Sequence, residues 1–298
     1  MGGGLIPVLR GVFNGLLLAA NTLAGFALMP LPALVKLAVP VAGVRKACDR
    51  LLNAIATGWV AVNNAWIAAA CPAPWQVQGL EGLHRHGWYL VCPNHQSWVD
   101  ILVLQRVFHR RIPFLKFFLK RELIWVPVIG LAWWALDFPF MKRGRGNKAR
   151  RGDLDATREA CEKFKRIPTA VINFVEGTRF TARRHAEQHS RFQHLLEPKI
   201  GGLGTALDTM GSTFEAMLDV TIVYPEGAPS FWDLLCGRVK SVAVDVRRRE
   251  IPQALLATGL LGDKAHRRQL REWIDLQWAE KDRLIPALLK EPPHAVGP

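Results

Sequence analysis

Two long stretches without a charged residue occupy the start of the chain, and they constrain its fold more than any other feature. The first covers residues 11–35 and the second residues 51–75. Each is long enough to cross the apolar core of a bilayer as a helix. A basic cluster at residues 45–50 lies between them. The sequence therefore predicts an N-terminal hydrophobic helical hairpin over residues 1–74, with a basic turn, that anchors the chain to a membrane.

The depth of this hairpin remains open. If both helices crossed the bilayer, the basic turn would lie opposite the basic region that follows, against the tendency of positive loops to share one side. A shallow hairpin within one leaflet avoids that conflict. A buried helix pair is the alternative, although the length and the lack of charge argue against it. We do not expect a cleavable signal peptide, because the apolar stretch is long and a second one soon follows.

Charge and aromatic content narrow the class of partner. The chain has 39 basic and 25 acidic residues, which gives a formal net charge of +14 and indicates an anionic partner, either nucleic acid or acidic phospholipid. Eleven tryptophans against two tyrosines favour the phospholipid, because tryptophan concentrates at membrane interfaces. We therefore expect a bilayer with anionic lipids as partner and no nucleic acid. The five scattered cysteines form no C-x-x-C pair and predict neither a disulfide framework nor a metal site.

The remainder, residues 75–298, is predicted to be an α/β domain with C-terminal helices. Strands are expected at residues 75–80, 88–92, 112–118, 138–143, 169–174, 219–225 and 241–246. Helices are expected at residues 98–109, 153–166, 205–217 and within 251–290, with two short helices in 120–134. In the last segment, Trp125, Trp133 and Trp134 fit a lipid interface and ordinary core packing equally well.

A histidine lies where a predicted buried strand ends. The apolar run at residues 88–92 leads to His95, at the carboxyl end of a strand, where α/β proteins place their chemistry. Asp100 follows in the first turn of the next helix, where it can fix the imidazole tautomer of His95 and stabilise its protonated form. This arrangement predicts a general base. From spacing alone, Ser97 and Asp100 fit a helix N-cap and its N3 acid equally well.

A second apolar strand leads into a tight charged turn formed by Glu176, Gly177, Thr178 and Arg179. Gly177 permits the turn, and Thr178 can form a hydrogen bond to the backbone or to a ligand. The planar guanidinium of Arg179 suits a phosphate group. An ion pair between Glu176 and Arg179 that serves structure alone is the alternative.

Two further segments could contact anions. The basic segment at residues 144–151 can help to hold the protein on an acidic membrane, at about 1 kcal/mol for each charge, or can be a solvated approach to a helix. The glycine-rich turn at residues 195–204 can direct backbone N–H groups at an anion, although a glycine cluster alone is a weak signal.

These motifs together resemble a known family. Residues 94–100 look like the H-x4-D motif of the glycerolipid acyltransferases, the 1-acylglycerol-3-phosphate acyltransferase family. Residues 174–179 resemble its F-P-E-G-T-R motif, with Val175 in place of proline. Residues 138–143 resemble the block that ends in a phosphate-binding arginine, although Asp137 stands where glycine is usual. Residues 219–225 resemble the fourth block, and all four occur in the family's order.

The hairpin and the turn at residues 198–202 also resemble the YihG-like bacterial branch, which is similar to eukaryotic lysocardiolipin acyltransferases. Membership in this family implies an α/β fold with a mixed central sheet flanked by helices. It also implies a bacterial inner-membrane protein whose active site faces the cytoplasm. The implied acyl donor is acyl-CoA or acyl carrier protein, with no cofactor and no metal.

The resemblance implies transfer of a fatty acyl group from a thioester to the free hydroxyl of a lysophospholipid, converting 1-acylglycerol-3-phosphate to phosphatidic acid. His95 would be the general base and Asp100 its orienting partner. Arg143 and Arg179 would hold the acceptor phosphate, and Glu176, Gly177 and Thr178 would complete the substrate-binding turn. Another lysophospholipid acceptor, or a non-catalytic protein that binds anionic lipid, is the alternative.

The same chemistry requires hydrogen-bond donors for a tetrahedral oxyanion. We expect them among the backbone N–H groups that follow His95 or surround Gly177. A covalent role for Ser97 is not expected, because no second base is evident and direct transfer needs none.

Overall fold

A six-stranded mixed sheet forms the centre of the computed structural model, which describes residues 4–71, 75–117, 119–138, 140–141, 162–256 and 263–290. The strand order is β1-β8-β7-β2-β6-β3. The neighbouring strands β7, β2, β6 and β3 run parallel, whereas β8 is antiparallel to β7 and parallel to β1. The bounds are β1 Trp75–Gln78, β2 Tyr89–Pro93, β3 Leu115–Phe117, β6 Ala170–Ile172, β7 Ala216–Val223 and β8 Val242–Arg249. The predicted mixed sheet is confirmed.

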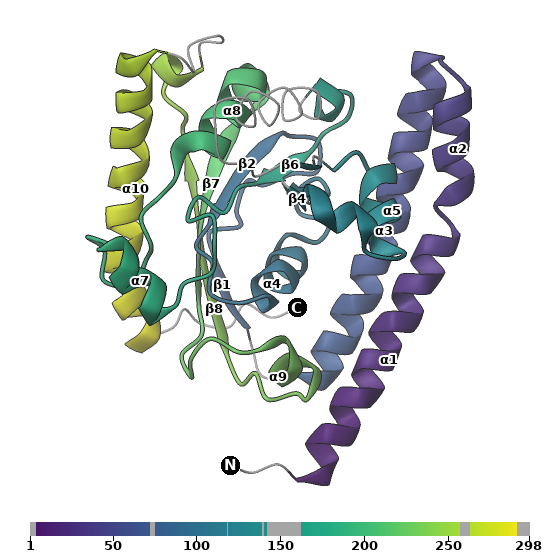
Figure 1. Cartoon of the computed structure of the whole chain (residues 1–298), viewed down its shortest axis with the longest axis horizontal. Helices are drawn as coiled ribbons and strands as arrows, with labels where there is room; N and C mark the ends of the chain where they lie inside the picture. Colours follow the sequence, from purple (N-terminus) through teal and green to yellow (C-terminus); the bar gives the residue numbers. More distant parts are fainter. Residues whose placement is uncertain are drawn as a thin grey trace.

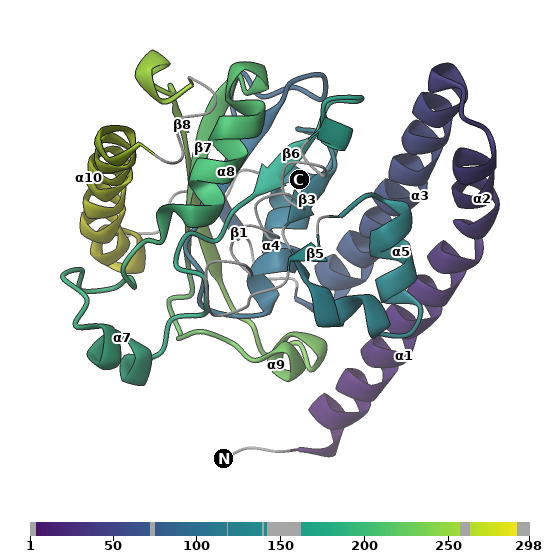
Figure 2. The ribbon, with the colours of Figure 1, turned by 45° about the horizontal axis from the view of Figure 1, so that its top comes forward.

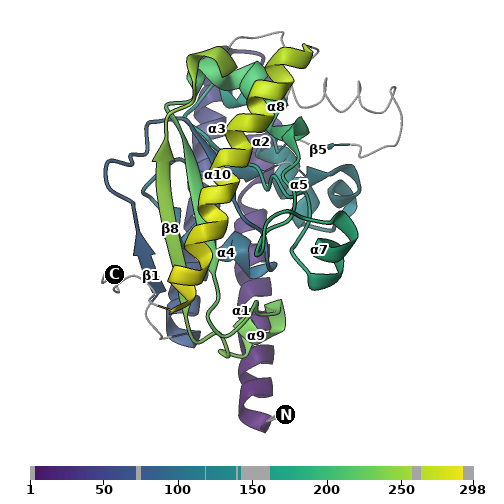
Figure 3. The ribbon, with the colours of Figure 1, turned by 90° about the vertical axis from the view of Figure 1, so that its left-hand side faces the viewer.

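Helices cover both faces of the sheet because its central strands are apolar on both sides. Alternate residues of β2 divide between two cores: Tyr89 and Val91 face α4 (Val99–Phe108), and Leu90 and Cys92 face α8 (Ile200–Met210) and α10 (Lys264–Lys290). Figures 1 and 2 show α8 and α10 on one side and α4 on the other. In Figure 3, α10 lies along the sheet face remote from the N-terminal helices.

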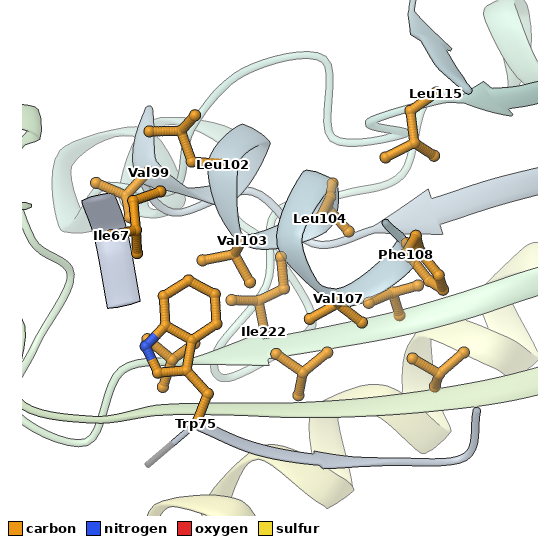
Figure 4. Packing of buried hydrophobic residues seen from close by; sticks show 14 of the residues in the cluster. Ile67, Trp75, Val99, Leu102, Val103, Leu104, Val107, Phe108, Leu115 and Ile222 are labelled. Atoms are coloured by element: carbon orange, nitrogen blue, oxygen red, sulfur yellow. The ribbon is translucent and has the colours of Figure 1, made fainter. Parts of the chain in front are cut away.

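The predicted helix at 98–109 is confirmed as α4, and its packing fixes one end of the site. Figure 4 shows the side chains of Val103 and Val107 directed toward the sheet, near Ile222. Trp75 of the edge strand closes the same cluster. The first turn of α4 is therefore held rigidly beside the carboxyl ends of β2 and β7.

The N-terminal helices form a hairpin, as predicted, but its turn is elsewhere. They are α1 Leu5–Ala27, α2 Pro30–Ala38 and α3 Ala42–Ala70. The chain reverses at residues 39–41, around Pro40, which cannot donate a helical hydrogen bond. The basic cluster at 45–50 lies inside α3, because its alanine, lysine and arginine residues favour a helix. The prediction of a basic turn was wrong.

The two sides of the hairpin have different surroundings. In the part of the chain that the structure describes, residues 5–38 are the one helical stretch long and apolar enough to cross a membrane, and only 11% of its most apolar window is buried. Polar groups of α1 face the protein instead: Asn14 donates to the carbonyl of Leu235 (2.8 Å), and Asn21 to that of Trp59 (3.0 Å). By contrast α3 packs into the body of the protein, and its end shares a core with the sheet.

Three smaller predictions have mixed outcomes. The two short helices are confirmed as the 3₁₀ turn Arg121–Trp125 and α5 Ile129–Ala135. Trp125 is 84% exposed and Trp134 42%, whereas Trp133 packs against Phe117. Among the described residues of the segment at 138–143, two form β5 (Phe140–Met141), which pairs with β4 (Leu119–Lys120) outside the main sheet.

The predicted helix at 205–217 was wrong in its bounds. α8 begins at Ile200 and ends at Met210, and residues 216–217 already belong to β7. The glycines that indicated a turn lie in the first part of this helix. The helix forms despite the low helix propensity of glycine, because Leu203, Ala206 and Leu207 pack into the core.

Candidate active site

The loop that carries His95 is fixed at the carboxyl ends of the parallel strands. Asn94 is buried, and its side chain both donates to the carbonyl of Ile222 (2.9 Å) and accepts from the N–H of Ile222 (2.7 Å). It therefore continues the pairing between β2 and β7 after Pro93. The carbonyl of His95 accepts from the N–H of Phe180 (2.7 Å). This loop is held on two sides by backbone contacts.

His95 and Asp100 meet as predicted. The Nδ1 atom of His95 lies 2.8 Å from Oδ2 of the wholly buried Asp100. That oxygen also accepts from the N–H groups of Gln96 (2.6 Å) and Ser97 (2.9 Å). The Oδ2 atom of Asp100 is therefore a hydrogen-bond acceptor, and Nδ1 of His95 carries the proton that it donates to this oxygen. The other ring nitrogen, Nε2, is left to accept a proton. Asp100 thus both caps its helix and orients His95.

Tyr224, which follows β7, contacts Asp100, and the sequence did not predict this contact. Its hydroxyl donates to the Oδ1 atom of Asp100 (2.6 Å). Burial, followed by the charge of Asp100, raises the pKa of Tyr224 well above its ordinary value, so the hydroxyl keeps its proton. The carboxylate of Asp100 therefore accepts from four donors and is fixed in orientation.

The turn predicted to bind substrate lies directly against His95. The Oε1 atom of Glu176 accepts from the N–H of His95 (3.2 Å), and the ring of Phe174 stacks on the imidazole with centroids 4.1 Å apart. Glu176 is wholly buried, and this burial raises its pKa to about 8, although the N–H of His95 and the charge of Lys281 oppose the shift. No ion pair joins Glu176 to Arg179, both of which the structure describes. The alternative of a structural ion pair is therefore wrong.

Replacing Glu176 is expected to change how stability depends on pH. The carboxyl has a pKa of about 8 when folded and an ordinary 4.5 when unfolded, so the folded protein loses stability as pH rises through this interval. Glutamine cannot ionise. We expect Glu176→Gln to exceed the wild type in unfolding free energy by on the order of a few kcal/mol at pH 9 and to approach it near pH 5. Denaturant titrations across this range measure the difference, and a pH-independent difference would contradict a neutral buried carboxyl.

Arg179 is placed beside the pair, whereas the second predicted phosphate ligand is not described. The guanidinium carbon of Arg179 lies 5.1 Å from the ring centroid of Trp98, the residue before α4. Gly177 has a φ of +68°, which favours glycine, and the side chain of Lys199 lies against it. Thr178 is half-buried in the same turn. Arg143, together with the basic segment that follows it, lies outside the described residues.

An apolar cavity of about 600 Å³ lies along α4. It is lined by Trp98, which precedes α4, and by Ile101, Leu102 and Gln105 of the helix. α1, α3 and α5 close the other sides, and Trp133 lies in the wall. Trp98 lines the cavity and contacts Arg179, so it lies between the cavity and the charged turn. A cavity with this lining suits an alkyl chain.

A buried lysine of α10, Lys281, contacts the strands that carry the site. Nζ of Lys281 donates to the carbonyls of Cys92 (2.9 Å) and Val220 (2.6 Å) and lies 2.7 Å from Oδ1 of Asp219. It therefore joins the carboxyl ends of β2 and β7, which carry His95 and Tyr224. In the sequence this residue looks like one more lysine of an amphipathic helix, and no local signal marks it.

Three of the N–H groups in the segments where oxyanion donors were expected already have acceptors. The N–H groups of Gln96 and Ser97 donate to Asp100, and that of Gly177 donates to the carbonyl of Phe174 (2.8 Å). The hydroxyl of Ser97 donates to the carbonyl of Pro229 (2.5 Å) and accepts from the N–H of Val99 (3.0 Å). Both contacts join this hydroxyl to the backbone, and the absence of a nucleophilic role for Ser97 stays a prediction.

Comparisons with known proteins identify relatives of this region. Residues 74–225 match the family model described as Acyltransferase. The mouse 1-acyl-sn-glycerol-3-phosphate acyltransferase epsilon is 26% identical over 219 residues, which cover 64% of this chain and 55% of the relative. The human gamma form is 27% identical over 55% of this chain and 43% of the relative. Lysocardiolipin acyltransferase 1 of Danio rerio is 25% identical over 60% of this chain and 46% of the relative.

The chain thus spans about half the length of the curated relatives it matches. Among solved structures, the 1-acyl-sn-glycerophosphate acyltransferase PlsC from Thermotoga maritima covers 92% of this chain and 98% of its own, with a TM-score of 0.49 and 18% identity.

Proposed function

The chain belongs to the acyltransferase family, whose model spans just over half of it, and from that membership we propose that it transfers a fatty acyl group from a thioester to the free hydroxyl of a lysophospholipid. The acceptor we propose is 1-acylglycerol-3-phosphate, and the product is phosphatidic acid. One observation carries the proposal: the hydrogen-bonded pair of His95 and Asp100 lies at the start of α4, where Trp98 contacts the guanidinium of Arg179 on one side and lines an apolar cavity on the other.

In the proposed reaction, Nε2 of His95 takes the proton of the acceptor hydroxyl as its oxygen attacks the thioester carbonyl. The bond to sulfur then breaks, and the thiolate that leaves takes up a proton. Asp100 holds the imidazole and offsets the positive charge that develops on it. A positioned base of this kind contributes about 10²- to 10⁴-fold to the rate.

The surroundings suit amphiphilic substrates. The acyl chain of the donor would occupy the apolar cavity, and the phosphate of the acceptor would contact Arg179. The exposed apolar surface of α1 and α2 supports seating at a bilayer, so that neither lipid needs to leave it entirely. We extend the proposal to an inner-membrane location with the site facing the cytoplasm. The YihG-like branch assignment and the division at residues 74 and 75 stay predictions.

A substrate panel tests the proposal. Purified full-length protein in neutral detergent is mixed with acyl-CoA of several chain lengths, or with acyl carrier protein thioesters. Acceptors are the lysophospholipids of phosphatidic acid, phosphatidylglycerol and cardiolipin, the last because one relative bears that name. Mass spectrometry of the products should show acylated 1-acylglycerol-3-phosphate in greatest yield. If no acceptor is acylated from any donor, a lipid-binding role without catalysis replaces this proposal.

Removing the guanidinium of Arg179 is expected to affect the acceptor. A hydrogen bond to a charged group is worth roughly 1.5–3 kcal/mol, so Arg179→Ala should raise the acceptor KM by about tenfold or more and leave the donor KM unchanged. Steady-state kinetics with each substrate varied in turn measure this. Arg183→Ala, an exposed neighbour paired with Glu187, is the matched control. An unaltered acceptor KM and rate would exclude a phosphate contact.

A further inference from the structure

A second pocket, of about 730 Å³, lies at the end of α4 remote from His95. It is lined by the first half of α3 and by the segments at residues 85–86, 112–113 and 167–168. These segments lead into β2, β3 and β6, which are parallel. The pocket therefore lies at the amino ends of strands whose carboxyl ends carry the active site.

The lining of this pocket is strongly cationic. Arg50, Arg85 and Arg110 contribute to it together with His86 and His109, and the described lining contains no acidic side chain. No ion pair joins any of the three arginines to another residue in the described ranges. The three arginines are exposed, and guanidinium groups without a carboxylate partner suit a phosphate group, which each can bind through two N–H donors.

The same pocket contains hydrogen-bond acceptors that lack a donor. Oδ1 of Asn53 and Oε1 of Gln105 are buried, and neither has a hydrogen-bond partner among the described residues. A buried acceptor without a donor is costly, so a ligand that brings hydroxyl groups would remove that cost once rotation of either amide turns its oxygen toward the pocket. A phosphate ester alone brings no donor at neutral pH. The lining therefore favours a ligand that combines phosphate with free hydroxyls.

The position of the pocket favours a lipid as the source of such a group. Leu51, which follows Arg50 on α3, is 52% exposed, and the apolar side chains of α1 and α2 are also largely exposed. Gln105 and Phe114 line both this pocket and the apolar cavity, so the two spaces adjoin. We propose that this pocket binds the phosphoglycerol head group of an anionic phospholipid, at a site separate from the acceptor site. The inference does not depend on catalysis.

Binding of short-chain lipids to the full-length protein in neutral detergent tests the proposal by calorimetry. The probes are dioctanoyl phosphatidylglycerol, dioctanoyl phosphatidylmethanol, which has the same charge without hydroxyls, and dioctanoyl phosphatidylcholine. Glycerol 3-phosphate tests for a soluble ligand instead. We expect phosphatidylglycerol to bind most tightly, and glycerol 3-phosphate to bind at least about tenfold more weakly. Tighter binding of glycerol 3-phosphate would overturn the lipid assignment.

Variants locate the binding. Arg50→Gln combined with Arg85→Gln should weaken phosphatidylglycerol binding by about tenfold or more. Arg183→Gln combined with Arg268→Gln, which removes the same charge from exposed sites, should change it less than about threefold. Equal losses in the two double variants would reduce the effect to net charge and overturn the proposal.

A third variant tests recognition of the hydroxyls. Asn53→Ala should abolish the preference for phosphatidylglycerol over phosphatidylmethanol while acyl transfer continues. If Asn53→Ala kept the preference for phosphatidylglycerol over phosphatidylmethanol, the unpaired oxygen of Asn53 would not bind the hydroxyls, which would contradict this part of the proposal.

Discussion

Replacing His95 with alanine is expected to lower acyl transfer by roughly 10²- to 10⁴-fold, because the acceptor hydroxyl then lacks a base. The loss should be in kcat with both substrates saturating. The fold should survive, because Asp100 keeps three of its four donors, the N–H groups of Gln96 and Ser97 and the hydroxyl of Tyr224. Turnover followed by product mass, together with a thermal melt, measures both expectations.

The control for this variant is His84→Ala, which removes a half-exposed histidine that pairs with Glu215. It should retain the activity of the wild type. Turnover by His95→Ala at the rate of this control would eliminate the general-base assignment. If His95→Ala loses both its activity and its thermal transition, the loss of activity reflects unfolding. The less disruptive His95→Gln is therefore measured in parallel. Turnover by a folded His95→Gln at the control rate would equally eliminate the assignment.

The sequence predicted the parts of the site that are local in the chain. His95 and Asp100 are five residues apart and their contact follows from a strand, a loop and a helix start. The strand before Glu176 likewise predicted its turn. The two strands are parallel and end at one edge of the sheet, and there the N–H of His95 contacts Glu176.

The sequence pattern did not predict contacts between residues that are distant along the chain. Tyr224 reaches Asp100 across 124 positions, and Lys281 reaches the carbonyl of Cys92 across 189. Nothing in the neighbouring residues of either one indicates its partner. The neutral state of Glu176 also escaped prediction, because it results from complete burial and not from any adjacent residue.

Local sequence signals misled in two places. The basic cluster at 45–50 suggested a turn by its charge, but its residues are good helix formers and continue α3. The glycines near residue 202 suggested a loop, but they lie inside α8, whose Leu203, Ala206 and Leu207 pack into the core. Helix propensity explains the first case, and core packing explains the second.

Changing Asp100 to asparagine isolates the role of its charge. In the Asn variant the two N–H groups of Gln96 and Ser97 still require an acceptor, so the amide oxygen should take the place of Oδ2, beside Nδ1 of His95. The amide nitrogen would then face Tyr224, whose hydroxyl can accept as well as donate. The imidazole would keep its tautomer and lose only the negative charge that stabilises its protonated form.

We therefore expect Asp100→Asn to lower kcat by about 10²-fold, less than a change of tautomer would cause, with little change in melting temperature. Asp100→Ala should instead leave two buried N–H groups unpaired, at about 1–3 kcal/mol each, and lower stability as well as rate. Tyr224→Phe keeps the charge and should cost less than about tenfold. Kinetics and thermal melts of the three variants separate these effects. If Asp100→Asn turned over like the wild type, the charge of Asp100 would have no part in the reaction, and its role would be limited to orienting His95 and holding the loop before α4.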